Sequence, residues 1–292
     1  MSLAAHLQTG VTTVARAWAV SRRDGVVLGF TDHDRDLAFE GIVFRARTGM
    51  TARALEQTTG LGVDNSEAVG ALSDAAISEA DILAGRYDDA SISLWWVNWA
   101  DVSQRQLRFR GSLGEVVRAG GAFRAELRGL AETLSRPQGR VYQAPCSAVL
   151  GDAACGVDLS QPDLSVTVPV ATVGNEGDRF GFPALAGFAP RWFEKGRLEV
   201  LGGAAAGLSG LVKSDRSQEG GREITLWQRL GAEVAAGDPV RLVAGCDKRA
   251  ETCRVKFNNF SNFRGFPHIP GEDWLMAVPR EGDLNDGGSL KR

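Results

Sequence analysis

The sequence predicts a mainly β protein with two domains. Its 292 residues suffice for about two domains of ordinary size. Thirty-six glycines and 10 prolines exceed the usual share of turn-forming residues, which favours strands joined by tight turns. Stretches of alternating polar and apolar residues recur along both halves and are bounded by such turns.

The pattern of the first half predicts several strands and one helix. Alternation predicts strands at residues 12–20, 26–31 and 42–45. The segment 91–99 is apolar on both faces, so we expect its own domain to cover it on both sides. The alternative is that one face meets another subunit. Ser73 is the expected N-cap of a helix over residues 74–84, which ends where Gly85 can adopt a left-handed conformation.

Two glycine pairs predict hairpin turns. Gly120 and Gly121 separate alternating segments at 115–119 and 122–128, and Gly220 and Gly221 separate two more in the second half. Both central positions of the favoured two-residue turn need positive φ, which glycine adopts readily. These turns predict meander or barrel-like sheets.

The second half is again rich in expected strands. A short helix at 130–135 stops before Pro137, which marks the domain boundary. We therefore expect a first domain at 1–140, a second at 141–280 and a flexible polar tail at 281–292. Alternation predicts strands in the second domain at 165–173, 197–201, 208–215, 222–230 and 239–244.

Charge and hydropathy exclude several classes of protein. With 33 basic and 36 acidic side chains the net charge is −3, so no whole-molecule attraction to nucleic acid or anionic membranes is expected. No apolar run approaches the roughly 18 residues that span a bilayer, so we expect no membrane insertion. Residues 1–10 lack the features of a signal peptide, which predicts synthesis and folding in the bacterial cytoplasm.

The four cysteines carry most of the functional information. They form two close pairs, Cys146 with Cys155 and Cys246 with Cys253, with eight and six residues between the members of each pair. In a reducing compartment such pairs indicate metal ligands more than disulfides, because two loops can each bring two thiolates to one point. The sequence therefore predicts one metal centre with these four ligands.

The spacing leaves the kind of centre open. Paired ligands of structural zinc are usually two to four residues apart, and neither pair fits that pattern. Ligands of an iron–sulfur cluster can come from longer loops, and four cysteines saturate a 4Fe–4S cluster. We favour the cluster, with zinc, two disulfides or unligated thiols as alternatives. Four basic side chains within residues 246–256 favour thiolates, and a fully ligated cluster has a structural role.

His33, between Asp32 and Asp34, is a second candidate site. A carboxylate beside an imidazole is compatible with acid–base chemistry or a metal site. No nucleophile in a recognisable turn accompanies it, and a polar β-turn explains the aspartates equally directly. We favour the turn.

An aromatic stripe follows the last cysteine. Phe257, Phe260, Phe263 and Phe266 recur at every third position, a pattern compatible with stacking on single-stranded nucleic acid. Because Gly265 and two prolines are close by, we favour a loop core beside the cysteines instead. The stripe is interleaved with the polar residues Lys256, Asn258, Asn259, Asn262 and Arg264. The asparagine amides among them can donate hydrogen bonds to backbone groups or cluster sulfurs.

The sequence contains no P-loop, dinucleotide fingerprint, nucleophile elbow or zinc-protease helix. We therefore expect a protein that is not an enzyme. The alternative is an iron–sulfur enzyme of redox or cell-wall processing, which needs an open iron position or a catalytic pair.

Several segments resemble the hub, or tail-tip, proteins of phage-like gene transfer agents, which are related to the tail-tip protein L family of phage lambda. The C-terminal part resembles the lambda family, from which it departs in the 90 residues between Cys155 and Cys246, a longer stretch than that family has. Nearly the whole chain is similar to the gene transfer agent hubs. The segments that carry the resemblance are 31–34, 67–72, 244–249, 252–254, 257–259 and 262–271.

The resemblance implies a fold, a cofactor and partners. It implies a tail-tube-like β-barrel or sandwich in the first domain, which forms a homotrimeric ring at the end of the tail. In the β-rich second domain, it implies an iron–sulfur cluster on the four cysteines. The implied neighbours are the distal tail protein and a baseplate or receptor-binding protein, with DNA only passing through the channel. Exposed tryptophans would suit such contacts: Trp95, Trp96 or Trp99.

Overall fold

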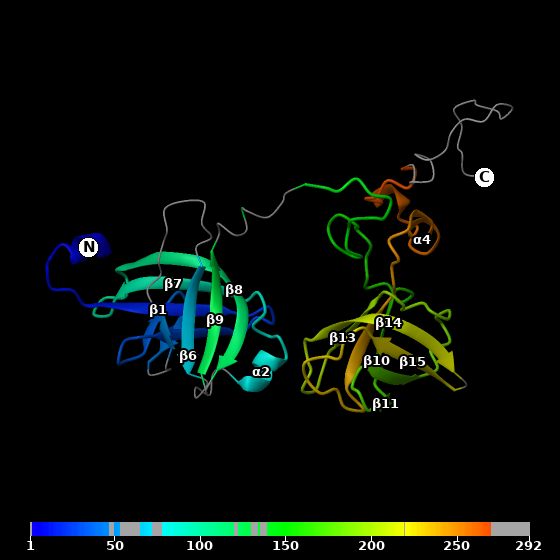
Figure 1. Cartoon of the computed structure of the whole chain (residues 1–292), viewed down its shortest axis with the longest axis horizontal. Coiled ribbons are helices and arrows are strands. Elements are labelled where there is room, and N and C mark those ends of the chain that lie inside the picture. The colour runs from blue at the N-terminus through cyan, green and yellow to red at the C-terminus, as the bar shows by residue number, and fades with distance from the viewer. Residues whose placement is uncertain are drawn as a thin grey trace, which may run out of the picture. The chain divides into compact units, whose positions relative to one another are not determined.

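The computed structural model describes residues 2–46, 50–52, 65–71, 78–119, 122–129, 134, 139–218 and 220–269 (Figure 1). The chain divides into two compact units. The first unit spans Met1–Pro137 and includes Ala204–Leu208 and Leu230–Val234, and the second contains the remaining residues. Each unit is built on one β-sheet, which confirms the expectation of a mainly β protein with two β-rich parts. Among the helices in the described ranges, none has the length and apolar character needed to cross a bilayer.

The first unit contains a nine-stranded sheet that curves into a half-barrel. Its strand order is β3-β4-β2-β1-β7-β8-β9-β6-β5, and all neighbours are antiparallel except β2 and β4. The strands are β1 (Val14–Ser21), β2 (Val27–Thr31), β3 (Leu37–Phe39), β4 (Ile42–Arg45), β5 (Met50–Ala52), β6 (Asn65–Ala71), β7 (Ser91–Asn98), β8 (Arg105–Ala119) and β9 (Ala122–Gly129).

The two central strands, β1 and β7, are buried on both faces. On one face Trp18 and Leu94 belong to a cluster with residues of β2, β8 and β9. On the other face, alanines of β1 leave room for Phe39, Phe44 and Trp95, whose rings pack edge to face or stack at 4.1–5.8 Å. The apolar pattern on both faces of segment 91–99 thus corresponds to burial on both faces of β7, as predicted.

The tryptophans of β7 differ in exposure. Trp95 is a core residue and is 8% exposed, so of the three tryptophans proposed for contacts it does not offer an exposed surface. Trp96 is half-buried beneath the Arg108 guanidinium, and only Trp99, at 42%, is exposed. The side chains of β7 alternate between the two cores, with Ile92 and Leu94 on one face and Trp95 and Val97 on the other. The bulge opposite lies in β8, since Leu94 pairs with Phe109 and Trp95 with Leu107.

Two short helices accompany the first sheet, α1 (Leu3–Leu7) and α2 (Glu79–Leu83). The Oγ of Ser78 caps α2 by accepting a hydrogen bond from the Asp81 N–H (3.1 Å). Gly85 has φ of 70° just beyond the helix, as the sequence predicts. Ser73, the expected N-cap, lies outside the described residues, and so do Gly120, Gly121 and nearly all of the expected helix at 130–135.

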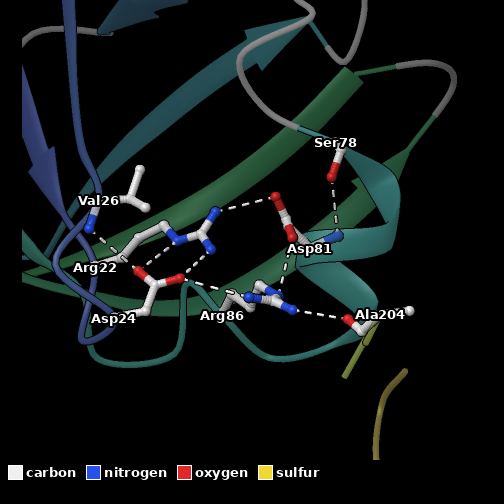
Figure 2. A network of polar contacts seen from close by, with 7 residues as sticks. All are labelled: Arg22, Asp24, Val26, Ser78, Asp81, Arg86 and Ala204. Atoms are coloured by element: carbon white, nitrogen blue, oxygen red, sulfur yellow. Dashed lines mark hydrogen bonds and ion pairs between the residues drawn. The ribbon is translucent and has the colours of Figure 1, made fainter. Parts of the chain in front are cut away.

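A network of arginines and aspartates attaches α2 to the β1–β2 turn (Figure 2). Arg22 donates to Asp24 (3.1 Å) and to Asp81 (3.0 Å), and Arg86 also pairs with Asp81 (3.0 Å). Arg86 further donates to the carbonyl of Ala204 (2.9 Å), in one of the short segments that belong to the first unit. The Arg22 guanidinium lowers the pKa of Asp24 by hydrogen bonding, so the network keeps its charges.

The second unit contains a seven-stranded sheet with the order β10-β16-β13-β14-β15-β12-β11. Its strands match the expected segments closely, although β12 was not expected and segment 165–173 is split between β10 and β11. The strands are β10 (Ser165–Pro169), β11 (Thr172–Val173), β12 (Arg179–Pro183), β13 (Arg197–Val200), β14 (Ser209–Gln218), β15 (Gly221–Leu226) and β16 (Pro239–Val243).

The β14–β15 hairpin turns one residue earlier than predicted. Gly221 is already the first residue of β15 and pairs with Gln218. Gly220, with φ of 81°, is therefore a turn residue, whereas Gly221 is not. The sheet has its own apolar core, in which the largest fully buried side chains are Phe180, Phe193, Leu198, Ile224, Leu226 and Leu242.

A buried ion pair lies inside this second unit. Arg222 binds Asp215 through two hydrogen bonds (2.6 and 2.7 Å), and the two side chains are 2% and 0% exposed. Asp215 also accepts from the Phe193 N–H (2.8 Å), and Arg222 donates to the Phe188 carbonyl (3.0 Å). The pair thereby holds the segment before β13 against the β14–β15 hairpin.

We expect Arg222→Met to destabilise the protein by about 3–5 kcal/mol, because it leaves the Asp215 carboxylate buried without a partner. Urea unfolding followed by circular dichroism measures the loss. Arg191→Met is the matched control, since Arg191 pairs with Glu194 on the surface and its side chain is 74% exposed. Equal stability of the two variants would contradict the role of the buried pair.

Candidate metal centre

Strand pairing in the second sheet brings the two cysteine pairs together. The first residue of β10, Ser165, lies opposite the last residue of β16, Val243. The ladder continues one step further, where the Ala244 N–H donates to the Leu164 carbonyl (2.8 Å). The chain before β10 and the chain after β16 therefore leave the sheet at the same end, although they are far apart in sequence.

The four predicted ligands line one pocket above this end of the sheet. Cys146 and Cys155 lie in the segment before β10, and Cys246 and Cys253 lie in and just before α4 (Ala250–Val255), which Figure 1 shows beside that segment. The pocket encloses about 330 Å³ of empty space, part of it open to solvent. Cys253 is buried, the other three cysteines are half-buried, and none is in a disulfide.

Backbone hydrogen bonds hold the two cysteine segments in place. The Cys146 N–H donates to the Lys248 carbonyl (2.9 Å), which joins the first segment to the second. The Asp152 carboxylate accepts from the Cys155 N–H (2.6 Å) and so shapes the loop between the first two cysteines. These bonds fix the backbone on both sides of the pocket.

The stretch after α4 closes the pocket on another side. The Arg264 N–H donates to Cys146 Sγ (3.3 Å), and its carbonyl accepts from Ser147 Oγ (3.1 Å). Gly265 permits this approach because a Cβ there would lie 2.5 Å from the Ala144 carbonyl oxygen. Cys253 Sγ donates to the Asn259 carbonyl (3.3 Å).

The surroundings of Cys246 and Cys253 disfavour their thiolate forms in this pocket. Burial raises the pKa of Cys246, against the influence of nearby Lys248. Burial also raises the pKa of Cys253, and the charges of the other three thiolates raise it further. A bound cation reverses this effect, because it stabilises each thiolate that faces it.

The donor set fits an iron–sulfur cluster. The four cysteines supply the four sulfur ligands that a 4Fe–4S cluster takes, and all four line one pocket. Among the residues that the structure describes, no three His, Cys, Asp or Glu side chains form a site for a single metal ion.

A half-buried lysine, Lys256, connects the cysteine segment to the sheet. Lys256 Nζ donates to the carbonyls of Trp192 (2.6 Å) and Gly245 (2.9 Å) and lies 4.2 Å from the centre of the Trp192 indole. Burial lowers the pKa of Lys256 to about 8. Because Gly245 precedes Cys246 and Lys256 follows Cys253, this one ammonium sets the distance between the two ends of the second cysteine segment.

The phenylalanine stripe surrounds the pocket, as the loop-core interpretation predicts. Phe257 and Phe263 line the pocket, and Phe260 stacks on Phe263 (5.7 Å). Phe266 stacks on Tyr142 (3.7 Å), before the first cysteine. The rings thus pack against the protein itself.

The residues around His33 form a turn. Asp32 accepts from the Arg16 N–H (2.7 Å) and Asp36 from the Ala46 N–H (2.8 Å), so these carboxylates satisfy backbone donors. His33 Nδ1 accepts from the Arg35 N–H (3.0 Å), and its ring packs against Trp99 at 5.0 Å. The polar-turn interpretation accounts for these contacts.

The comparisons with known proteins agree with this architecture. Residues 1–158 match a family model described as "Baseplate hub protein, N-terminal attachment domain", and residues 191–273 match one described as "Phage conserved hypothetical protein BR0599". A solved chain from "Virion of native gene transfer agent (GTA) particle" is 59% identical, with 99% of each chain covered and a TM-score of 0.89. A search of curated proteins finds no match.

The first match covers more than half of the chain and defines its class, a structural protein of a phage-type baseplate. The chain belongs to the baseplate hub family, as a tail hub protein of the gene transfer agent type. The resemblance drawn from the sequence is thus confirmed.

We expect Lys256→Met to destabilise the protein by about 1–3 kcal/mol, because it leaves the buried carbonyl of Gly245 without its ammonium donor. Urea unfolding measures the loss of stability. We also expect faster alkylation of Cys246, because the segment around this cysteine becomes less tightly held. Lys213→Met serves as the control, since Lys213 is an exposed lysine that lies over exposed Trp227. Unchanged alkylation of Cys246 in Lys256→Met would argue against the proposed spacing role.

Proposed function

We propose that this hub joins the distal tail ring to the baseplate or receptor-binding protein around the DNA channel. In this proposal the chain acts as a homotrimer, and a structural 4Fe–4S cluster on Cys146, Cys155, Cys246 and Cys253 holds its second unit together. Its role is mechanical, and it is not an enzyme.

The main evidence for the cofactor is that the four cysteines lie close together in the fold. They come from segments separated by 90 residues, yet they line one pocket. A bound cluster would cross-link these segments covalently, which removes conformational freedom from the unfolded chain and couples metal binding to folding. Because the protein supplies all four ligands, the cluster has no open iron for a substrate, which supports a structural role.

Two features of the first unit support the proposed contacts with other tail proteins. The matched family model is described as an attachment domain, which suits contacts between the first unit and the rest of the tail. Trp99 and Leu107 are both 42% exposed on the β7–β8 part of that unit, and exposed aromatic and apolar side chains suit protein contacts. With a net charge of −3, the hub has no strong overall attraction for DNA in transit.

The enzyme alternative has less support. The polar groups around His33 are engaged in the hydrogen bonds of a turn. An iron–sulfur enzyme would need an iron that a substrate can reach, and a fully cysteine-ligated cluster has none. Turnover of a redox substrate by the purified, iron-loaded protein would reverse this order of preference.

We expect purified protein to be brown, with broad absorbance near about 400 nm and roughly four irons and four acid-labile sulfides per chain. Replacing any one of the four cysteines by serine should remove most of this iron. The circular dichroism signal of the second unit should also weaken, because the cluster joins its two cysteine segments and couples metal binding to folding. Iron and sulfide analysis with absorbance spectra provides the measurement.

Val157→Ala is the matched control, since Val157 lines the same pocket but supplies no ligand. It should retain iron. A colourless wild-type protein that carries one zinc and no sulfide would refute the cluster.

The hub role is tested on assembled particles. Electron cryo-microscopy of particles with a tag on this chain should show three copies at the distal end of the tail. Density for the tag in the head or along the tail tube would contradict the proposal.

A further inference from the structure

Asn259 connects one cysteine of each pair. Its backbone N–H donates to the Cys253 carbonyl (3.0 Å), and its own carbonyl accepts from Cys253 Sγ (3.3 Å). Its side-chain Nδ2 donates to the Cys155 carbonyl (2.6 Å) and lies 3.7 Å from Cys155 Sγ. A single residue thus contacts ligands from both segments of the pocket.

Asn262 determines which way the Asn259 amide points. Asn262 lies at the end of the short helix η1 (Phe260–Asn262), and its Nδ2 donates to Asn259 Oδ1 (2.7 Å). A side-chain amide has one accepting end and one donating end. With its oxygen held by Asn262, the Asn259 amide presents its NH₂ group to Cys155.

We propose that Asn259 is a positioning residue for the cluster, which presents Cys155 with a donor directed at its sulfur, and that Asn262 acts through Asn259. This inference rests on the proposed cluster. An N–H donor near a ligating sulfur stabilises the thiolate and draws electron density from it, which raises the reduction potential of an iron–sulfur cluster. Asn259 therefore affects both how tightly the cluster is held and its potential.

The first test compares the same substitution at neighbouring positions. Asn259→Asp replaces the donor by a carboxylate oxygen that faces the sulfur and carbonyl of Cys155. We expect iron affinity, measured by competition with a chelator, to fall about 10- to 100-fold. The cluster that remains should have a lower reduction potential in a redox titration.

Asn258→Asp is the control for the first test. Asn258 is exposed, with φ of 46°, a conformation that Asn and Asp both tolerate. The change in charge and composition is identical, so we expect neither affinity nor potential to move.

The second test keeps every atom of Asn259 and changes the orientation of its amide, together with one added negative charge at position 262. In Asn262→Asp, the new carboxylate can only accept, so the Asn259 amide turns its NH₂ group towards it and its oxygen towards Cys155. We expect the potential to shift in the same direction as in Asn259→Asp.

The outcomes separate the two proposals. Wild-type protein without iron and sulfide refutes the cluster, and this inference falls with it. If wild type holds a cluster but Asn259→Asp matches Asn258→Asp in affinity and potential, only the role of Asn259 is refuted. If Asn259→Asp does not fold, Asn262→Asp decides, because it keeps every atom of Asn259, and an unchanged potential there refutes the inference.

Discussion

The antiparallel pairing of β10 with β16 is the constraint on which the candidate metal centre depends. It places Ser165 opposite Val243, so the chain enters and leaves the sheet at the same end. The five strands in between can form a domain of their own without separating the cysteine pairs. A long insertion between two ligand pairs is therefore compatible with one shared site, because its two ends are held together by the ladder.

The position of the pocket also depends on the contacts that hold that end of the sheet in place. The buried Asp215–Arg222 pair holds the segment that precedes β13, and the carbonyl of Trp192 in that segment accepts from Lys256. The sheet thus supports the cysteine segments through hydrogen bonds to buried backbone groups. Such groups are costly to leave unpaired, so the support is specific as well as stabilising.

The first unit is organised differently, around a long sheet whose central strands are packed on both faces. Alternating alanines on one face of β1 make room for the aromatic rings of β3, β4 and β7, while larger side chains fill the opposite face. Strands buried on both sides are held by two cores at once. A sheet packed on both faces in this way suits a structural protein of the baseplate hub family.

The local patterns of the sequence determined a good deal about this protein. They predicted its mainly β character, most strands of the second sheet, the two-sided burial of β7 and the four cysteines as one set. Side-chain alternation, glycine turns and cysteine spacing are properties of neighbouring residues, so they can be read without a structure.

Only the tertiary structure decided which side chains meet across the chain. Trp95 is buried because Phe39 and Phe44 pack against it, and β12 is a strand because β15 pairs with it. In the sequence, Asn259 is one of several asparagines interleaved with phenylalanines, and the local pattern does not distinguish it from the others. Its contact with Cys155 arises from the non-local β10–β16 pairing, and no pattern of neighbouring residues encodes the partner of a strand.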